Sequence, residues 1–480
     1  MAATTAALPQ EGSRHSWIFA AVGLVAFAAA GGVALATSEF DAFWLTLGAT
    51  LCIAVMFDFR VGVVSLIVML PISDSGVFFP HALMGVPALN PINLLIAATL
   101  LSYVLRGRLG AKTGTLVRWE LVWLFMIPIV IGGLLGAPHA EDVLPFFFER
   151  GLINFTGAGG YLRDLVMKPL LIPVVAVLIG AAAARSHKPE SFIIPIALSV
   201  WVVALVQIGF IFHSGIRLSM LAATSNREFL SAIGIHANDL GRVYAAAYAL
   251  LLFTWWESKR PGLKTFLFIT MGLLAFALML TFSRGAFTGF IVVNLLFLAW
   301  KFNAKTAALA VAAIAIFAIF APGYLYSRVM LGMESGDANT VSAGRIDEIW
   351  LPLLPEIFKS PIWGNGLGSV MWSSPMLAGA MHTVDHPHNA YFETLLDMGI
   401  VGVGLLLTFY WYVWRGFRKL GSNAYLSPEM RGFFQGAAAS LIAFLVSGMA
   451  GSSLRPTFEF VHLWMAIGMM YGLLARRPAG

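Results

Sequence analysis

The sequence predicts an all-α polytopic membrane protein, and its composition is the first reason. Of the 480 residues, 59% are hydrophobic and only 11% are charged, and the mean hydropathy is +0.83. Soluble domains carry about 25% charged residues. A soluble fold of this length has no interior large enough for so much apolar surface, so the solvent for most of the chain must be a lipid bilayer.

Long apolar runs are the second reason. A membrane-spanning helix needs about 20 apolar residues, and none of the runs shows the period-two alternation of a membrane β-barrel. We expect about fourteen spans, or alternatively twelve because the runs at 61–72 and 92–105 are short. We expect the first run to be a retained helix, since it exceeds the apolar region of about 7–15 residues in a signal peptide. The expected spans are 17–37, 40–57, 61–72, 92–105, 119–136, 166–184, 191–212, 238–256, 264–281, 285–300, 306–322, 390–414, 431–450 and 458–475.

The distribution of charge predicts the orientation. Lys and Arg concentrate in the connections at 106–118, 185–190, 257–264 and 415–431. Since cytoplasmic loops are the basic ones, these connections and the N-terminus are expected on the cytoplasmic side of the membrane.

Three domains are then expected. Residues 1–322 would hold helices 1–11, residues 323–389 one large periplasmic loop, and residues 390–480 the C-terminal helices. Apolar residues between Trp350 and Phe358 predict an amphipathic helix in that loop. A single cysteine, Cys52, excludes an internal disulfide.

A histidine-rich segment opens the expected span at 390–414. It reads Asp385-His386-Pro387-His388-Asn389-Ala390-Tyr391. Histidine exchanges a proton near neutral pH, and asparagine is a favoured helix N-cap. The segment predicts a general base at the start of a helix, with Asn389 and Tyr391 as supporting residues. A zinc site that also uses His382 and Glu393, or plain surface histidines, are the alternatives, and we expect no metal here.

The basic residues expected on the periplasmic side are mostly arginines, whose planar fork pairs with two phosphate oxygens. Arg284 lies in the short turn Thr281 to Gly285 between two apolar runs, where an ionisable residue is costly and a candidate for function. The other candidates for binding a diphosphate are Arg227, Arg217 and Arg345, and Asn238 is a further supporting residue. The alternative is that these arginines pair with acidic side chains or reach toward lipid head groups. We expect Asn238 or Asp239 to cap the helix that follows.

Taken together, these motifs resemble the O-antigen ligase and O-antigen polymerase superfamily. The run from His386 to Gly399 is similar to its H-x-H-N signature, and Gly344 to Trp350 with Pro361 to Gly368 is similar to the preceding motif. Thr281 to Gly285 resembles its S-R-G element. Arg227 to Asn238 resembles its R-G-H-x-N element, although His236-Ala237-Asn238 has alanine where proline is common, which leaves Arg217 as a competitor of Arg227. The similarity covers roughly residues 225–415.

This resemblance implies a glycosyltransferase of the GT-C type in lipopolysaccharide biosynthesis. The donor would be a glycan linked to undecaprenyl diphosphate, and the acceptor a hydroxyl of lipid A-core. The transfer would invert the anomeric centre at the periplasmic face, without metal, cofactor or nucleic acid. His388 would be the base, His386 would position it or the acceptor, and Arg284 with Arg227 would hold the diphosphate.

Two alternatives stay open at the level of the sequence. A polysaccharide repeat-unit polymerase of the same superfamily would use the same motif with a different acceptor. A transporter or flippase would also have many spans, but its polar residues would follow the midplane of several helices rather than gather in one external region.

Overall fold

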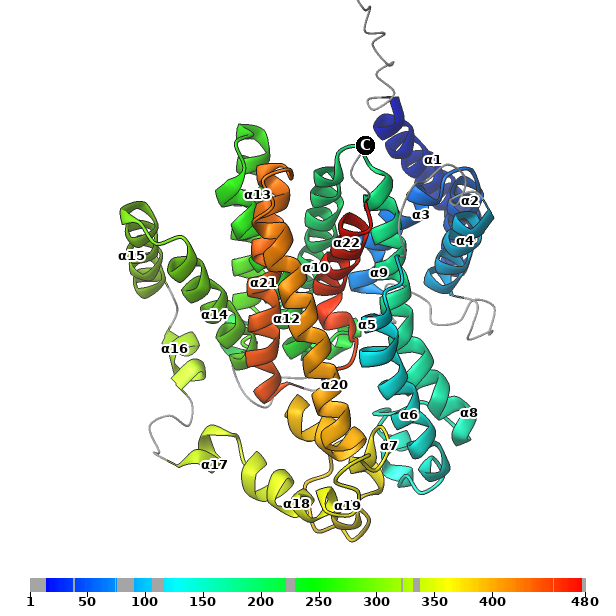
Figure 1. Ribbon diagram of the computed structural model, residues 1–480, viewed down its shortest axis with the longest axis vertical. Helices are drawn as coiled ribbons and strands as arrows, with labels where there is room; N and C mark the ends of the chain where they lie inside the picture. The colour runs from blue at the N-terminus through cyan, green and yellow to red at the C-terminus, as the bar shows by residue number, and fades with distance from the viewer. Residues whose placement is uncertain are drawn as a thin grey trace, which may run out of the picture. The chain divides into compact units, whose positions relative to one another are not determined.

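The structure is a computed structural model that describes residues 14–37, 39–73, 75, 90–105, 116–221, 229–320, 323–330, 337–451 and 453–476. Every regular element in these ranges is a helix, and none is a strand (Figure 1). Six of the helices are long and apolar enough to cross a membrane: Trp119–His139, Gly157–Arg185, Pro189–Ser214, Pro261–Met279, Ala390–Gly421 and Pro428–Ala450. The all-α membrane class is confirmed, whereas the count of twelve or fourteen spans stays a prediction.

Shorter apolar helices of 10–17 residues accompany these six: Gly23–Thr37, Asp41–Phe57, Phe59–Ile72, Pro91–Leu105, Arg284–Trp300, Ala304–Ala315 and Phe458–Leu474. The helix Ala237–Glu257 carries buried charge and belongs to neither group. Each of the fourteen expected spans nevertheless coincides with helical residues in the structure.

The chain divides into two compact units, Met1–Ala111 and Lys112–Gly480. The first unit contains α1 (Arg14–Thr37), α2 (Phe40–Phe57), α3 (Phe59–Met69) and α4 (Pro91–Leu105). Asp58 separates α2 from α3, and its carboxylate accepts from the backbone N–H of Arg60 at 2.9 Å and pairs with its guanidinium at 2.6 Å. An N-cap of this kind lets one helix end and the next begin without unpaired backbone groups.

The longer helices of the second unit are α6 (Ile127–Gly136), α9 (Lys168–Arg185), α10 (Ile193–Ser214), α12 (Ala237–Glu257), α13 (Pro261–Met279), α14 (Arg284–Trp300), α15 (Ala304–Phe320), α20 (Ala390–Gly421), α21 (Pro428–Ser447) and α22 (Val461–Leu474). The short helices are α5 (Trp119–Leu121), α7 (Pro145–Glu149), α8 (Gly157–Leu162), α11 (Leu218–Leu221), α16 (Gly323–Met330), α17 (Ala338–Val341), α18 (Leu351–Ile357) and α19 (Ser374–Leu377). The amphipathic helix expected in the large loop is α18, which buries Leu353 and exposes Leu351.

Two G-x-x-x-G motifs bring helices of the second unit into backbone contact. On α21, a Cβ added to Gly432 or Gly436 would lie 2.4 Å from a backbone oxygen of α12. On α22, a Cβ at Gly468 or Gly472 would lie 2.0 Å from a backbone oxygen of α9. In lipid, the hydrophobic effect does not drive helices together, so close packing of small residues is a main source of helix–helix association. Figure 1 shows α12 and α21 side by side in the unit.

The helix α20 bends at Gly399, which has φ 62° and ψ −171°. The loop 361–368 fills the break. The backbone N–H groups of Ile400 and Val401 donate to Pro361 and Ile362, and the carbonyls of Leu396 and Asp397 accept from Asn365 and Gly366 at 2.8 and 3.0 Å. The backbone groups freed by the kink are therefore paired, and the loop is fixed against the helix that begins at the histidine segment.

Candidate functional site

The histidine segment is held at the start of α20. The side chain of Asn389 accepts from the backbone N–H groups of Tyr391 and Phe392 at 3.1 and 3.2 Å, so it is the N-cap. The hydroxyl of Tyr391 donates to the carbonyl of Leu445 on α21 at 2.6 Å. Trp350, from the large loop, donates its indole N–H to the carbonyl of Pro387 at 2.8 Å. Three different segments thus position the two histidines.

His386 and Asp385 form a pair, with Nδ1 of the ring 2.7 Å from the carboxylate. Because an ionised carboxylate only accepts hydrogen bonds, Nδ1 carries a proton and Nε2 is left for a ligand. The ring of His388 lies edge-on to that of His386, with centroids 4.2 Å apart. The backbone of His388 has φ 54°, a left-handed conformation that is uncommon outside glycine and often marks functional positions.

The environments of the two histidines shift their pKa values in opposite directions. For His386, burial lowers the pKa, but the hydrogen bond and the charge of Asp385 outweigh it, so the net shift is upward. For His388, burial, then the positive charges of His386 and Arg345, lower the pKa to about 2. The pKa of Asp385 is raised by burial but lowered further by His386, and the net shift is downward. At neutral pH the ring of His388 is therefore neutral, and beside it lies His386, whose pKa is raised by its carboxylate partner.

Arg284 and Asn238 occupy neighbouring helix starts. Arg284 is the first residue of α14, and Ser283 caps that helix. The hydroxyl of Ser283 donates to the amide oxygen of Asn238 at 2.8 Å, which brings the S-R-G and H-x-N elements together. The cap of α12 is His236, whose Nδ1 accepts from the N–H of Asn238. The prediction that Asn238 or Asp239 caps this helix was wrong, because α12 already begins at Ala237. The side chain of Asn238 accepts from Ser283 instead.

The remaining arginines are placed as follows. Arg345 precedes a π-helical turn at Ile346–Trp350 and lies close enough to His388 for its charge to lower the pKa of that ring. Arg217 is exposed just before α11. Arg227 lies outside the described residues, so the choice between Arg217 and Arg227 stays open.

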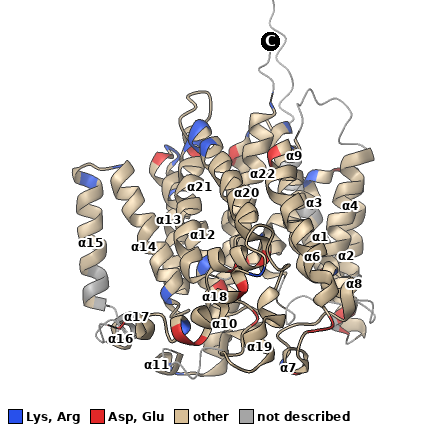
Figure 2. Cartoon of the chain, turned by 60° about the horizontal axis from the view of Figure 1, so that its bottom comes forward, with Lys and Arg blue, Asp and Glu red and all other residues tan. Residues whose placement is uncertain are grey.

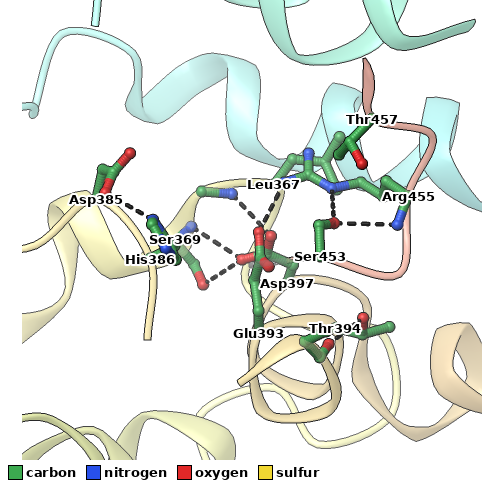
Figure 3. A network of polar contacts seen from close by, with 12 residues as sticks. Leu367, Ser369, Asp385, His386, Glu393, Thr394, Asp397, Ser453, Arg455 and Thr457 are labelled. Carbon is green, nitrogen blue, oxygen red and sulfur yellow. Dashed lines mark hydrogen bonds and ion pairs between the residues drawn. The ribbon is translucent and has the colours of Figure 1, made fainter. Parts of the chain in front are cut away.

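A network of buried ion pairs surrounds the histidines, and the sequence did not assign it a role. Arg242 on α12 pairs with Glu459, and Arg455 pairs with Glu393 on α20 at 2.7 Å. One turn further along α20, the carboxylate of Asp397 accepts from the backbone N–H groups of Gly368 and Ser369 (Figure 3). The charges of Glu393 and Arg242 both act on the pKa of His386, so these pairs border the site.

In the sequence, this network is indicated by two acidic residues, Glu393 and Asp397, four positions apart in an apolar run. Glu393 and Asp397 share one face of an apolar helix, and acidic side chains at that depth need partners. Those partners come from the distant segments 368–369 and 453–455, which pattern alone does not pair.

The comparisons with known proteins bear on this same region. The sequence model of the O-antigen ligase family matches residues 266–407. This stretch of the chain is therefore similar to that family. A search of curated proteins finds no match. The resemblance to the O-antigen ligase and polymerase superfamily is confirmed over this stretch.

The matched stretch includes four of the expected site residues, Arg284, Arg345, His386 and His388, together with Asn389 and Tyr391. Arg217, Arg227 and Asn238 precede it. The second half of the buried network, Glu459 and Arg455, follows it. Within the described residues, His, Cys, Asp and Glu form no group of three that would hold a metal ion.

A cavity of about 470 Å³ lies where loop 364–373 meets the helical segment ending at His139. Its polar lining includes His139 with Asp142, at 2.9 Å, and Lys359 with Glu356, at 2.7 Å. A space of this size is in the range of small-ligand sites, about 300–1,000 Å³, and its mixed charge suits a hydroxyl-rich group better than a phosphate.

Proposed function

We propose that the protein transfers a glycan from undecaprenyl diphosphate to an acceptor hydroxyl, with lipid A-core as the acceptor, at the periplasmic face of the bacterial inner membrane. The observation that carries this proposal is the pair His386 and His388, held at a helix start inside the stretch similar to the O-antigen ligase family, with their pKa values shifted apart. Pairs of titratable groups displaced in this way divide acid and base roles between them.

His388 is the proposed general base. Its imidazole is neutral at neutral pH, which is the form that accepts a proton. The negative charge of a bound diphosphate raises the pKa of His388 again, toward the range of an effective base. The acceptor oxygen forms a bond to the anomeric carbon while the bond from that carbon to the diphosphate oxygen breaks. The acceptor proton passes to His388, and the electron pair of the broken bond leaves with the diphosphate. Attack from the face opposite the leaving group inverts the anomeric centre.

The diphosphate is already a good leaving group, so its main requirement is stabilisation of developing negative charge. Arg284 supplies a bidentate fork for this, with Arg345 and either Arg227 or Arg217 as further contacts. His386, whose pKa is raised by Asp385, adds positive charge beside the base in its protonated form. Asn238 fixes the turn that carries Arg284 through Ser283.

Transfer by the purified protein tests this function. Undecaprenyl diphosphate-linked glycan and lipid A-core, without nucleotide or ion gradient, should give the ligated product, and a chelator should leave the rate unchanged. A protein that moves the donor across vesicles but forms no glycosidic bond would be a flippase instead.

The polymerase alternative differs only in the acceptor. The match to the O-antigen ligase family is consistent with a ligase and with a polymerase. Loss of the gene separates them. A ligase defect leaves lipid A-core bare, whereas a polymerase defect leaves it with one repeat unit.

A further inference from the structure

A second cavity lies at the ends of α14 and α20 that are opposite the histidine segment. It measures about 570 Å³ and is lined by Trp300, Lys301, Arg418, Lys419, Gly421, Ser422 and Gln435. Since α20 begins beside His388 and ends at Gly421, the cavity is separated from the proposed site by roughly 40 Å of helix. Nothing in the proposed transfer requires it.

The cavity has a net positive charge. Lys301 donates to Glu257 at 2.5 Å, but among the described residues Arg418 and Lys419 form no ion pair with an acidic side chain. The guanidinium of Arg418 lies 5.1 Å from the ring centre of Trp300 and 5.8 Å from that of Trp414. Stacking on indole rings orients a guanidinium but does not neutralise its charge. The N–H donors of Arg418 can therefore bind an anion.

Two buried polar atoms lack a hydrogen-bond partner among the described residues, one on Gln435, which lines the cavity, and one on Trp414, whose ring lies near Arg418. Gln435 donates its amide N–H to the carbonyl of Gly421 at 2.9 Å, which fixes the orientation of the amide, and its Oε1 accepts nothing. The indole N–H of Trp414 donates to nothing. Since buried polar groups are normally paired, a ligand that offers both a hydroxyl donor and an anionic oxygen would complete the site.

The surroundings are those of a membrane interface. Lys305 lies over the ring of Trp256 and Lys264 over that of Trp255, and Lys and Arg gather at one end of the second unit, near α21 (Figure 2). Trp marks the interface of membrane proteins, and basic pockets between helices at the cytoplasmic interface bind anionic head groups.

We propose that this cavity binds the head group of an anionic phospholipid that carries a free hydroxyl, of the phosphatidylglycerol class. The phosphate contacts Arg418 and Lys419, and the head-group hydroxyl donates to Gln435 Oε1. A soluble phosphate ester has the same chemistry, so the experiment must separate the two sources.

The test uses the full-length protein in detergent, with bound lipid counted by native mass spectrometry. The probes are phosphatidylglycerol, phosphatidylethanol, which is anionic but has no hydroxyl, and phosphatidylcholine, all with the same acyl chains. The wild type should bind phosphatidylglycerol at least tenfold more tightly than phosphatidylcholine. Arg418→Gln and Lys419→Gln should each weaken it about fivefold, the effect of one cation near a membrane surface.

Arg415→Gln is the matched control, since Arg415 is an exposed cation one turn earlier on α20 that does not line the cavity. It should bind phosphatidylglycerol as the wild type does. Gln435→Leu should remove the preference for phosphatidylglycerol over phosphatidylethanol while leaving the preference for anionic lipid. Thermal unfolding of each variant shows whether it is folded, and Lys419→Gln carries the test should Arg418→Gln fail to fold.

Three results would overturn the proposal. One is equal binding of phosphatidylglycerol and phosphatidylcholine. Another is an equal loss in Arg415→Gln and Arg418→Gln, which reports general surface charge. The third is displacement of the lipid by an equal concentration of glycerol 3-phosphate, which assigns the cavity to a soluble phosphate ester.

Discussion

At the scale of single residues, the proposed chemistry rests on the contrast between His386 and His388. Two histidines one residue apart meet different electrostatic surroundings, because Asp385 touches one ring and the positive charges of His386 and Arg345 act on the other. The difference follows from where the chain places a carboxylate, and it yields two predictions about these side chains.

We predict that His388→Ala lowers the transfer rate by about 10²–10⁴-fold, the usual contribution of a general base, while the protein still folds and binds the lipid donor. Donor binding and single-turnover transfer by the purified variant measure the two effects separately. Near-normal transfer would remove His388 as the base, and inactivity confined to His386→Ala would exchange the two roles.

The pH dependence follows from the raised pKa of His386. If the cationic form is needed, activity is present below that pKa and is lost as the pH rises through it. Asp385→Asn removes the interaction that raises the pKa, so the alkaline limb of the profile should move to lower pH. The lowered pKa of His388 predicts that no acid limb appears just below neutral pH. If the alkaline limb stayed in place in Asp385→Asn, the Asp385–His386 pair would not control the activity.

Arg284→Lys separates a diphosphate clamp from a cation that only reaches the membrane surface. Lys retains the charge but loses the bidentate fork, and one charge-assisted contact is worth about 1.5–3 kcal/mol. We predict normal folding and transfer at least about tenfold slower, since 1.4 kcal/mol is a factor of ten. Divalent metal should not restore the rate. A fully active Lys variant would place Arg284 outside the site.

At the scale of elements, the break in α20 links the histidine segment to the glycine-rich loop. The loop 361–368 supplies the hydrogen bonds that the helix loses at Gly399, and Asp397 accepts from the backbone just beyond it. In a helix that continued through Gly399, the backbone N–H and C=O groups would be paired within the helix. None of them would be available to hydrogen-bond with the loop.

Gly399→Ala should therefore disrupt the break. Its φ of 62° is strained for alanine, and a Cβ there would lie 2.3 Å from the carbonyl oxygen of Ile362. We expect a loss of at least about 1–3 kcal/mol of stability from backbone strain alone, together with reduced transfer, measured by thermal unfolding and activity.

Gly404→Ala is the control for that change, because it lies five residues further on the same helix, with open space around its Cα. Alanine is favoured over glycine by about 1 kcal/mol in a helix interior, so this variant should be as stable as the wild type or more so. An equal loss of stability in both variants would mean that alanine destabilises α20 wherever it replaces glycine. The loss in Gly399→Ala could then not be assigned to the break.

At the scale of the whole molecule, the orientation in the membrane decides which face carries the histidines. We predict that a cysteine at Ala338, on α17 of the large loop, reacts with an impermeant thiol reagent added from the periplasm, whereas one at Ala424, between α20 and α21, does not. Both positions are exposed. Cys52 is the only native cysteine and is first replaced by alanine. The opposite labelling pattern would reverse the orientation and move the proposed site to the cytoplasm.

The sequence by itself determined the class of the molecule, the place of most helices and the histidine segment. These are local properties. An apolar run must pair its backbone within itself in lipid, which is why the run at 40–57 became α2 (Phe40–Phe57), and an asparagine before such a run caps it, as Asn389 does.

Only the tertiary structure decided what surrounds those histidines. The partners of Glu393 and Asp397 lie at residues 453–455 and 368–369, and the kink at Gly399 exists because a distant loop pairs with it. The side chain of Asn238, expected as a possible cap of α12, accepts from Ser283 at the start of α14, and His236 caps α12. Each of these interactions joins segments far apart in the chain. A pattern along the sequence records which residues need partners, but which partner each one meets is set by how the helices pack.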